Sequence, residues 1–335
     1  MLLGSASPLC SAFDAALVDL DGVTYRGPEP IPHAAESLAA ARDAGMALVY
    51  VTNNASREPE AVAEQLTGLG IPTAPGDVMT AAQAAAAVLA ERLAPGSRVL
   101  VVGGAGLVTA VRSVGLEVVT SADDQPAAVV QGFAPEVGWR HLAEAAYAVQ
   151  NGAWYVASNL DLTLPNERGT APGNGSLVGV VRAATGVDPV SAGKPEPTMF
   201  RLAAERNQSR RPLVIGDRLD TDLQGARAAG YPGLHVLTGV SSARDAVLAT
   251  PKERPSFLGA DLRSLLSPHE APELAGQWWS VGAAGAAVRD GRLMLREAPD
   301  SQDVDRLDRV RAACAAVWAA TDAGVVVDPG SVSDL

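Results

Sequence analysis

Aspartates occur at the ends of two apolar runs that lie far apart in the sequence. Asp19 and Asp21 stand at the end of the run at residues 15–20, before a turn at Gly22, and Asp217 follows the run at residues 212–215. One carboxylate of such a pair can attack phosphorus and form an aspartyl-phosphate, while the other protonates the leaving alkoxide and later activates water. Three close carboxylates repel one another unless a cation lies among them, and oxygen-only ligands favour Mg²⁺.

Groups that could hold a phosphate follow other segments. Thr52, Asn53 and Asn54 come after the apolar run at residues 47–51, and Lys194 lies in the string GKPEP. Only two of the 26 basic residues are lysines, and a compact ammonium suits a crowded site between carboxylate and phosphate better than a planar guanidinium. Thr52 and the amides after it could donate to phosphate oxygens where a strand meets a helix. Each group alone is more often a cap or a turn residue, so the prediction depends on the whole set.

The elements that must position these groups alternate along the chain. Apolar runs predict strands at residues 15–20, 47–51, 98–102, 127–131, 153–157, 212–215 and 234–237. Helices are predicted at residues 32–44, 58–69, 81–93, 139–151 and 304–320. This alternation implies parallel strands with helical crossovers, and such sheets bind ligands beyond the carboxyl ends of their strands. The polar groups are therefore expected to meet in one crevice of a doubly wound, Rossmann-like α/β core.

Two other segments differ from this pattern. Residues 159–175 are rich in Gly, Pro and Asn and predict a loop that is too long for a simple connection. After about residue 266 the composition shifts, and the tail contains Trp278, Trp279 and a Gly-Ala stretch. We expect a small accessory region there, with the two tryptophans as packing residues rather than an interaction surface.

Composition excludes several classes of protein. The 335 residues allow two or three domains, and 47% hydrophobic residues with 4% aromatics imply a core of Ala, Val and Leu. The net charge of −12 without a basic run argues against nucleic-acid binding. Cys10 and Cys314 form no disulfide framework or thiolate zinc site, which suits a reducing compartment. No apolar run reaches the ~18 residues of a membrane span, so a cytoplasmic protein without membrane contact is expected.

The motifs together resemble those of a known family. The strings DLDGVTYRG (19–27), VTNNASR (51–57), GKPEP (193–197) and IGDRLDTD (215–222) are similar to the motifs of the haloacid dehalogenase superfamily of phosphatases. They resemble most closely the branch that includes nitrophenyl-phosphate, phosphoglycolate, glycerol-phosphate and pyridoxal-phosphate phosphatases. The resemblance covers about residues 13–265.

This resemblance implies a role for each matched residue. Asp19 would be the nucleophile and a ligand of Mg²⁺, and Asp21 the general acid and base with its backbone carbonyl on the metal. Asp217 would be the third ligand, and Asp222 would lie behind the ligands, whereas Asp220 is left out. The substrate phosphate would be held by Thr52, Asn53, Asn54 and Lys194.

The resemblance also implies an inserted α/β cap that selects the substrate. The expected division is residues 1–81 and 189–265 for the core, 82–188 for the cap and 266–335 for the accessory region. Asn159, Asp161, Glu167 and Arg168 in the long loop are the candidate selecting residues. Because that loop lacks aromatics, a small hydroxylated or carboxylated substrate such as glycerol 3-phosphate or phosphoglycolate is favoured. A broad-specificity or pyridoxal-phosphate phosphatase remains an alternative, and a homodimer through the cap is expected.

Two other classes of protein share some of these features. The string VLVVGGAGLVTA (99–110) is a strand, a Gly-rich turn and a helix, as in dinucleotide-binding enzymes, but Thr109 stands where the third glycine belongs. A phosphoacceptor signalling protein would also use clustered Asp, Thr, Lys and Mg²⁺. It would need neither the second acid at Asp21 nor an insertion of about 100 residues.

Overall fold

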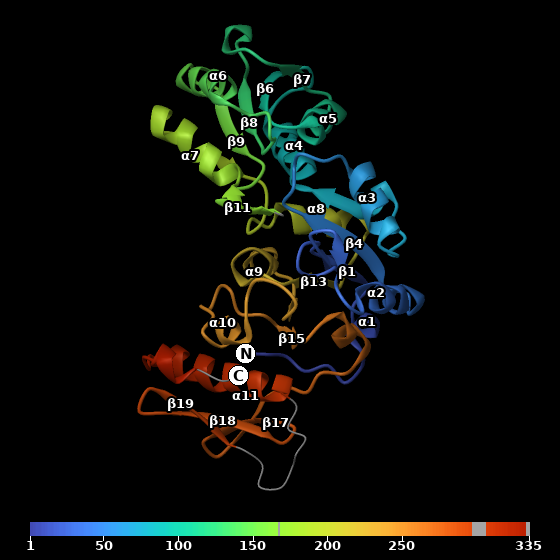
Figure 1. Cartoon of the computed structure of the whole chain (residues 1–335), viewed down its shortest axis with the longest axis vertical. Helices are drawn as coiled ribbons and strands as arrows, with labels where there is room; N and C mark the ends of the chain where they lie inside the picture. Colours follow the sequence, from blue (N-terminus) through green and yellow to red (C-terminus); the bar gives the residue numbers. More distant parts are fainter. Residues whose placement is uncertain (167, 297–305, 333–335) are drawn as a thin grey trace. The chain divides into compact units, whose positions relative to one another are not determined.

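The computed structural model describes residues 1–166, 168–296 and 306–332, and the chain forms two compact units (Figure 1). One unit comprises Met1–Leu48 and Arg206–Leu335, and the other comprises Val49–Glu205. Both contain parallel strands flanked by helices, so the predicted α/β organisation is confirmed. The predicted domain limits stay a prediction. Among the described residues, no helix is long and apolar enough to cross a membrane.

The first unit is built on four parallel strands in the order β15-β14-β13-β1. All four are buried, because a parallel sheet covered on both faces needs continuous apolar runs rather than alternation. Their bounds are β1 (Ala15–Val18), β13 (Pro212–Gly216), β14 (Gly233–Val236) and β15 (Phe257–Gly259). The unit also holds α1 (Leu9–Ala12), β2 (Tyr25–Arg26), β3 (Glu29–Pro30), α2 (Ala34–Asp43), α9 (Gln224–Ala229) and α10 (Ala243–Val247).

The C-terminal region of this unit is a four-stranded antiparallel sheet, which the sequence pattern did not predict. Its strands pair in chain order: β16 (Glu273–Ala275), β17 (Trp278–Val281), β18 (Ala284–Arg289) and β19 (Arg292–Arg296). Helix α11 (Arg306–Asp322) lies against this sheet (Figure 1). Buried small residues such as Ala286 and Ala313 belong to one hydrophobic cluster with Val247 and Leu258. The region therefore shares a core with the parallel sheet.

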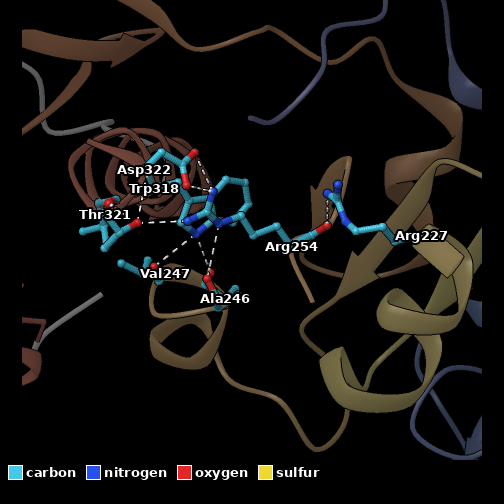
Figure 2. Close-up of polar contacts among 9 residues, drawn as sticks. Arg227, Ala246, Val247, Arg254, Trp318, Thr321 and Asp322 are labelled. Carbon is cyan, nitrogen blue, oxygen red and sulfur yellow. Dashed lines mark hydrogen bonds and ion pairs between the residues drawn. The ribbon is translucent and has the colours of Figure 1, made fainter. Parts of the chain in front are cut away.

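Arg254 joins α11 to the rest of the first unit (Figure 2). Its guanidinium is 6% exposed and donates from Nη1 to both Asp322 oxygens at 2.7 and 2.8 Å. The same group donates from Nη2 to Thr321 Oγ1 at 2.9 Å and lies 5.3 Å from the ring centroid of Trp318. Trp318 Nε1 in turn donates to Ala246 O at 3.2 Å. These contacts satisfy a buried charge and a buried indole at the same place.

The second unit begins with a pair of parallel strands. Strand β4 (Ala47–Thr52) starts in the first unit, continues into the second and pairs there with β5 (Val78–Thr80). Helices α3 (Pro59–Gly68) and α4 (Ala81–Arg92) follow these strands. Thr80 and Gln83 form a reciprocal capping box at the start of α4, with hydrogen bonds of 3.0 and 3.3 Å.

The rest of the second unit is a five-stranded parallel sheet in the order β12-β9-β8-β6-β7. Helices α4 and α5 cover one face, and α6 and α7 cover the other (Figure 1). The strands are β6 (Arg98–Val102), β7 (Glu117–Val119), β8 (Ala128–Gln131), β9 (Trp154–Ala157) and β12 (Val190–Ser191). The helices are α5 (Ala105–Ser113), α6 (Trp139–Gln150) and α7 (Asn174–Thr185), and α8 (Thr198–Arg206) leads out of the unit.

Two predicted segments differ from the structure. The segment at residues 159–175 contains an antiparallel hairpin, β10 (Thr163–Asn166) with β11 (Gly169–Pro172), and α7 begins at its end. The hairpin was not predicted because its short strands, TLPN and GTAP, carry no apolar alternation, although backbone pairing satisfies their backbone polar groups. Of the predicted terminal helix at residues 304–320, residues 304–305 lie outside the described residues, and the described helix α11 ends at Asp322, two residues later than predicted.

Candidate active site

Three carboxylates come together in the first unit. Asp19 directly follows β1, and its N–H donates to Ile215 O at 2.9 Å, which continues the ladder between β1 and β13. Asp217 directly follows β13, and Asp222 lies in the helical turn Leu219–Leu223. One carboxylate oxygen of each lies within 4.8 Å of the others. Two neighbouring strand ends and one turn therefore bring together aspartates that are about 200 residues apart.

Glycines make room for these carboxylates. A Cβ on Gly22 would lie 2.5 Å from Asp217 Oδ2, and Gly22 also has a φ of +81°, which favours glycine. A Cβ on Gly216 would lie 2.1 Å from Asp222 Cβ. The glycines of the two aspartate motifs are thus required by the crowding around the acids.

Backbone amides hold two of the acids in place. Asp217 and Asp222 are each 1% exposed, whereas Asp19 is half-buried. Val240 N–H donates to Asp217 Oδ2 at 2.6 Å, and Arg218 N–H donates to Asp222 Oδ2 at 3.2 Å. These bonds orient carboxylates that would otherwise be costly to bury.

Asp21 and Asp220 lie outside this carboxylate group. Asp21 is exposed in the turn after β1, where Gly22 N–H donates to Tyr25 O at 2.8 Å. Asp220 pairs with Arg218 at 2.8 Å, and the hydrogen bond from that guanidinium holds the pKa of Asp220 below its usual value. The structure thus brings Asp222 into the group and leaves Asp220 on the surface.

The carboxylate group fits a hard divalent cation. Its donors are carboxylate oxygens from Asp19, Asp217 and Asp222, without nitrogen or sulfur ligands. Mg²⁺ prefers such oxygen ligands, and a cation relieves the repulsion among three acids held within 4.8 Å. The residues present therefore suit the Mg²⁺ that the sequence predicts.

The predicted phosphate-binding residues lie together in the second unit. Lys194 is 4% exposed, its Nζ donates to Val51 O at 3.2 Å, and its N–H donates to Asn53 Oδ1 at 2.8 Å. Thr52 ends β4 and accepts the Asn54 N–H at 3.1 Å. The Asn54 side chain accepts from Ser56 N–H at 2.9 Å and stabilises the turn.

The residues predicted to select the substrate contact the same segment. Asn159 is 5% exposed, donates from Nδ2 to Asn53 O at 2.7 Å and accepts the Asp161 N–H at 3.2 Å. Asp161 Oδ2 accepts from Asn53 Nδ2 at 3.0 Å. Arg168 is exposed at the turn of the hairpin, and Glu167 lies outside the described residues. Asn159 and Asp161 are thus both joined to Asn53 by hydrogen bonds.

The Gly-rich turn after β6 contacts the chain itself. A Cβ on Gly106 would lie 2.5 Å from Arg57 O, and one on Gly104 would lie 2.9 Å from Ser56 O. Gly106 N–H also donates to Ser56 O at 3.2 Å. The segment after Asn54 therefore occupies the space above these glycines that the pyrophosphate of a dinucleotide would need.

Sequence reasoning missed two buried polar residues of the second unit, Gln131 and Asn174. Both are at most 2% exposed, and Asn174 Nδ2 donates to Asn159 O at 2.7 Å. For Asn174 the available signal was the string Gly173-Asn174-Gly175 at the start of an apolar helix, where a polar residue between two glycines indicates close backbone contact.

Two segments of the chain match known protein families. Residues 16–117 match the family described as haloacid dehalogenase-like hydrolase. Residues 191–265 match a second family, described as HAD-hydrolase-like. These ranges contain every residue of the carboxylate group and also Thr52 and Lys194.

Individual proteins are similar over most of the chain. The D-glycerol 3-phosphate phosphatase of Mycobacterium tuberculosis is 48% identical over 311 residues, 92% of this chain and 86% of that protein. An acid sugar phosphatase of Staphylococcus saprophyticus is 36% identical over 260 residues, 77% of this chain and 98% of that protein. The crystal structure of a glycerol phosphate phosphatase from M. tuberculosis in complex with magnesium is 46% identical, with a TM-score of 0.86, and the match covers 93% of this chain and 92% of that one.

Proposed function

Because the chain belongs to the haloacid dehalogenase-like hydrolases, we propose that it is a magnesium-dependent phosphatase that hydrolyses glycerol 3-phosphate through an aspartyl-phosphate at Asp19. The observation that carries the proposal is the group formed by Asp19, Asp217 and Asp222 at the ends of β1 and β13. The relative that is 48% identical and acts on D-glycerol 3-phosphate supports the choice of substrate.

Asp19 and Asp21 divide the chemistry between them. In the first step Asp19 attacks phosphorus, the bond from phosphorus to the ester oxygen breaks, and Asp21 gives its proton to the departing alkoxide. In the second step Asp21 takes a proton from water, the water oxygen attacks phosphorus, and the bond to Asp19 breaks. Glycerol leaves after the first step and inorganic phosphate after the second. The exposed position of Asp21 suits an exchange of protons with solvent.

The metal would be held by Asp19, Asp217 and the backbone carbonyl of Asp21. When bound, Mg²⁺ offsets the repulsion between the Asp19 carboxylate and the substrate phosphate. Asp222, whose carboxylate also belongs to the group of three, would lie behind these ligands and, held by the Arg218 N–H, orient the turn that carries Asp217.

Lys194, Thr52, Asn53 and Asn54 would bind the phosphate group. The Lys194 ammonium supplies a point charge, and Thr52 supplies a hydroxyl at the end of β4. The side-chain nitrogen and oxygen of Asn53 already make hydrogen bonds within the second unit. Asn53 and Asn54 would therefore offer their backbone N–H groups to the phosphate. Backbone N–H groups where a strand meets a helix favour the binding of a phosphate there.

Asp161, Arg168 and Asn159 would select the leaving group. Carboxylate and guanidinium groups suit the hydroxyls of glycerol, and the segment offers no aromatic platform for a pyridine ring or a base. Small sugar phosphates are a second candidate class, supported by the similarity to the acid sugar phosphatase.

A cytoplasmic location and a homodimer through the cap stay predictions. The exposed face of α6 carries Trp139 and Tyr147, 73% and 49% exposed, and such residues are enriched in protein interfaces. Light scattering on the wild-type protein and on Trp139→Ala tests the dimer, because the variant should be monomeric if this face is the interface.

The test of the proposed function is phosphate release from a panel of esters, with Mg²⁺ and with a chelator. The panel contains both enantiomers of glycerol 3-phosphate, phosphoglycolate, sugar phosphates, pyridoxal phosphate and nitrophenyl phosphate. We expect release only with Mg²⁺ and the highest kcat/KM for a glycerol 3-phosphate. Similar kcat/KM values across the panel would indicate a broad phosphatase. A stable phosphoprotein without turnover would overturn the proposal in favour of a phosphoacceptor.

A further inference from the structure

The start of α7 is pressed against the segment that leads into the β10–β11 hairpin. Gly173 N–H donates to Leu162 O and Gly175 N–H donates to Asp161 O, both at 2.9 Å. A Cβ on Gly173 would lie 2.3 Å from Asp161 O, and one on Gly175 would lie 2.2 Å from Leu160 O. Only glycines allow this approach of two backbones, so the string Gly173-Asn174-Gly175 holds residues 160–162 in place.

Asn174, between the two glycines, extends this contact into the protein interior. It is 2% exposed, and its Nδ2 donates to Asn159 O at 2.7 Å and to Gln131 O at 3.4 Å. The Gln131 side chain is fully buried and accepts from Tyr155 Oη at 2.5 Å. Asn174 thus joins the segment after β9 to the buried end of β8.

The same segment continues to the predicted phosphate-binding residues. Asn159 Nδ2 donates to Asn53 O at 2.7 Å. Asn53 Nδ2 donates to Asp161 Oδ2 at 3.0 Å and to Lys194 O at 3.2 Å, and Asn53 Oδ1 accepts the Lys194 N–H at 2.8 Å. An unbroken chain of hydrogen bonds therefore runs from Asn174 through Asn159 and Asn53 to the backbone of Lys194.

We propose that Asn174 is a positioning residue for phosphate binding, acting through Asn159 and Asn53 on Lys194. The inference rests on the proposed function, because Lys194 is taken to bind the substrate phosphate. Asn174 is buried and bonds to backbone carbonyls, so it acts through other residues and does not touch the substrate. Binding groups displaced by a fraction of an ångström lose much of their effect, which is why a remote hydrogen bond matters here.

The test compares Asn174→Ala with a matched control in the same turn of α7. Ser176→Ala is the control, because Ser176 Oγ donates to Leu162 O at 2.7 Å and, within the described part of the chain, makes no hydrogen bond to Asn159 or Asn53. The readouts are kcat and KM for glycerol 3-phosphate, the affinity for inorganic phosphate by titration calorimetry, and the urea unfolding midpoint. We expect Asn174→Ala to weaken phosphate affinity and raise KM in parallel by about tenfold, with kcat changed by less than about threefold. Ser176→Ala should match the wild type in all three kinetic and binding values.

A second variant covers the case in which Asn174→Ala does not fold. Gly175→Ala leaves Asn174 unchanged but would push residues 160–162 away, so it should produce the same parallel loss of phosphate affinity and rise of KM. A folded Asn174→Ala or Gly175→Ala with the wild-type phosphate affinity overturns the inference, as does a loss confined to kcat. Failure of the wild-type enzyme to hydrolyse any ester would instead remove the proposed function and the inference with it.

Discussion

Gly239 lies so close to Asp217 that a Cβ at this position would fall 1.9 Å from Asp217 Oδ2 and 2.4 Å from its Cγ. The neighbouring Val240 N–H holds the same oxygen at 2.6 Å. A loop that follows β14 therefore determines where a predicted metal ligand points.

Gly239→Ala should displace the Asp217 carboxylate and weaken Mg²⁺ binding by about tenfold or more, since groups that orient metal ligands have effects of that size. Activity should return at high Mg²⁺ concentration, which a titration of activity against Mg²⁺ measures. Gly179→Ala is the matched control, because nothing lies within 4 Å of the new Cβ in the middle of α7. The same Mg²⁺ dependence in both variants would contradict this role for Gly239.

Asp19→Asn should abolish turnover, because the amide cannot attack phosphorus, with kcat reduced by at least about a thousandfold. The circular dichroism spectrum should be unchanged. Asp220→Asn makes the same chemical change three residues from Asp217, but its side chain is 59% exposed and paired only at the surface. That variant should keep wild-type kcat, with stability altered by about 1 kcal/mol at most. Turnover by Asp19→Asn would exclude the covalent mechanism.

Asn53→Asp should raise KM by about tenfold, because a carboxylate would then face both Asp161 Oδ2 and the Lys194 carbonyl. Adding Asp161→Asn restores a donor opposite the new carboxylate and should recover part of the loss. A double-mutant cycle on KM for glycerol 3-phosphate should give a coupling energy of about 1 kcal/mol. Asn151→Asp, at the exposed end of α6, is the control and should not change KM. Additive effects of the two substitutions would show that the bond between Asn53 and Asp161 is unimportant.

Arg254→Ala should destabilise the first unit by about 2 kcal/mol, because Thr321 and the Trp318 ring lose a buried partner (Figure 2). The loss should not be larger, because the Asp322 side chain is 56% exposed and stays partly hydrated. Urea unfolding measures the change, and the folded variant should keep its kcat. Arg292→Ala is the control, because it removes an ion pair with Asp328 at the surface, where the two side chains are 61% and 47% exposed. Its free energy of unfolding should fall by no more than about 1 kcal/mol. Equal losses in the two variants would argue against a special role for the buried guanidinium.

The stability of the protein should fall as the pH drops from about 6.5 to about 4. Burial lowers the pKa of His235 from 6.5 to about 4, and its Nδ1 lies 3.3 Å from Gly216 O. Because the pKa is lower in the folded state, the unfolded chain binds the extra proton in this range. The contribution of the neutral His235 side chain to the free energy of unfolding is complete above pH 6.5 and is lost toward pH 4, by up to about 3 kcal/mol.

Urea unfolding of the wild type at pH 7 and pH 4.5 measures this dependence. His235→Asn should show a smaller loss of stability between the two pH values, since the buried imidazole is gone. His33→Asn changes an exposed histidine and should keep the wild-type dependence. An identical loss in all three proteins would assign the acid sensitivity to other groups.

Much of the fold could be predicted because parallel strands leave a strong signal. The centres of β1, β4, β6 and β13 are continuously apolar, and each strand was predicted within two residues of its bounds. The family inferred from the motifs is confirmed by the similarity to the 48% identical phosphatase. Strand β18 was missed because it consists largely of Gly and Ala, which have low strand propensity and pair here under the close packing of α11.

The sequence by itself determined the kinds of chemical group and their order, because each motif directly follows an apolar run whose end can be located along the chain. Only the tertiary structure decided which groups meet. Asn53 directs its side chain to Asp161 and Lys194, 108 and 141 residues away, and Gly239 and Val240 lie against the Asp217 carboxylate. Such choices depend on hydrogen bonds and crowding between segments that are distant in sequence, and no local pattern records them.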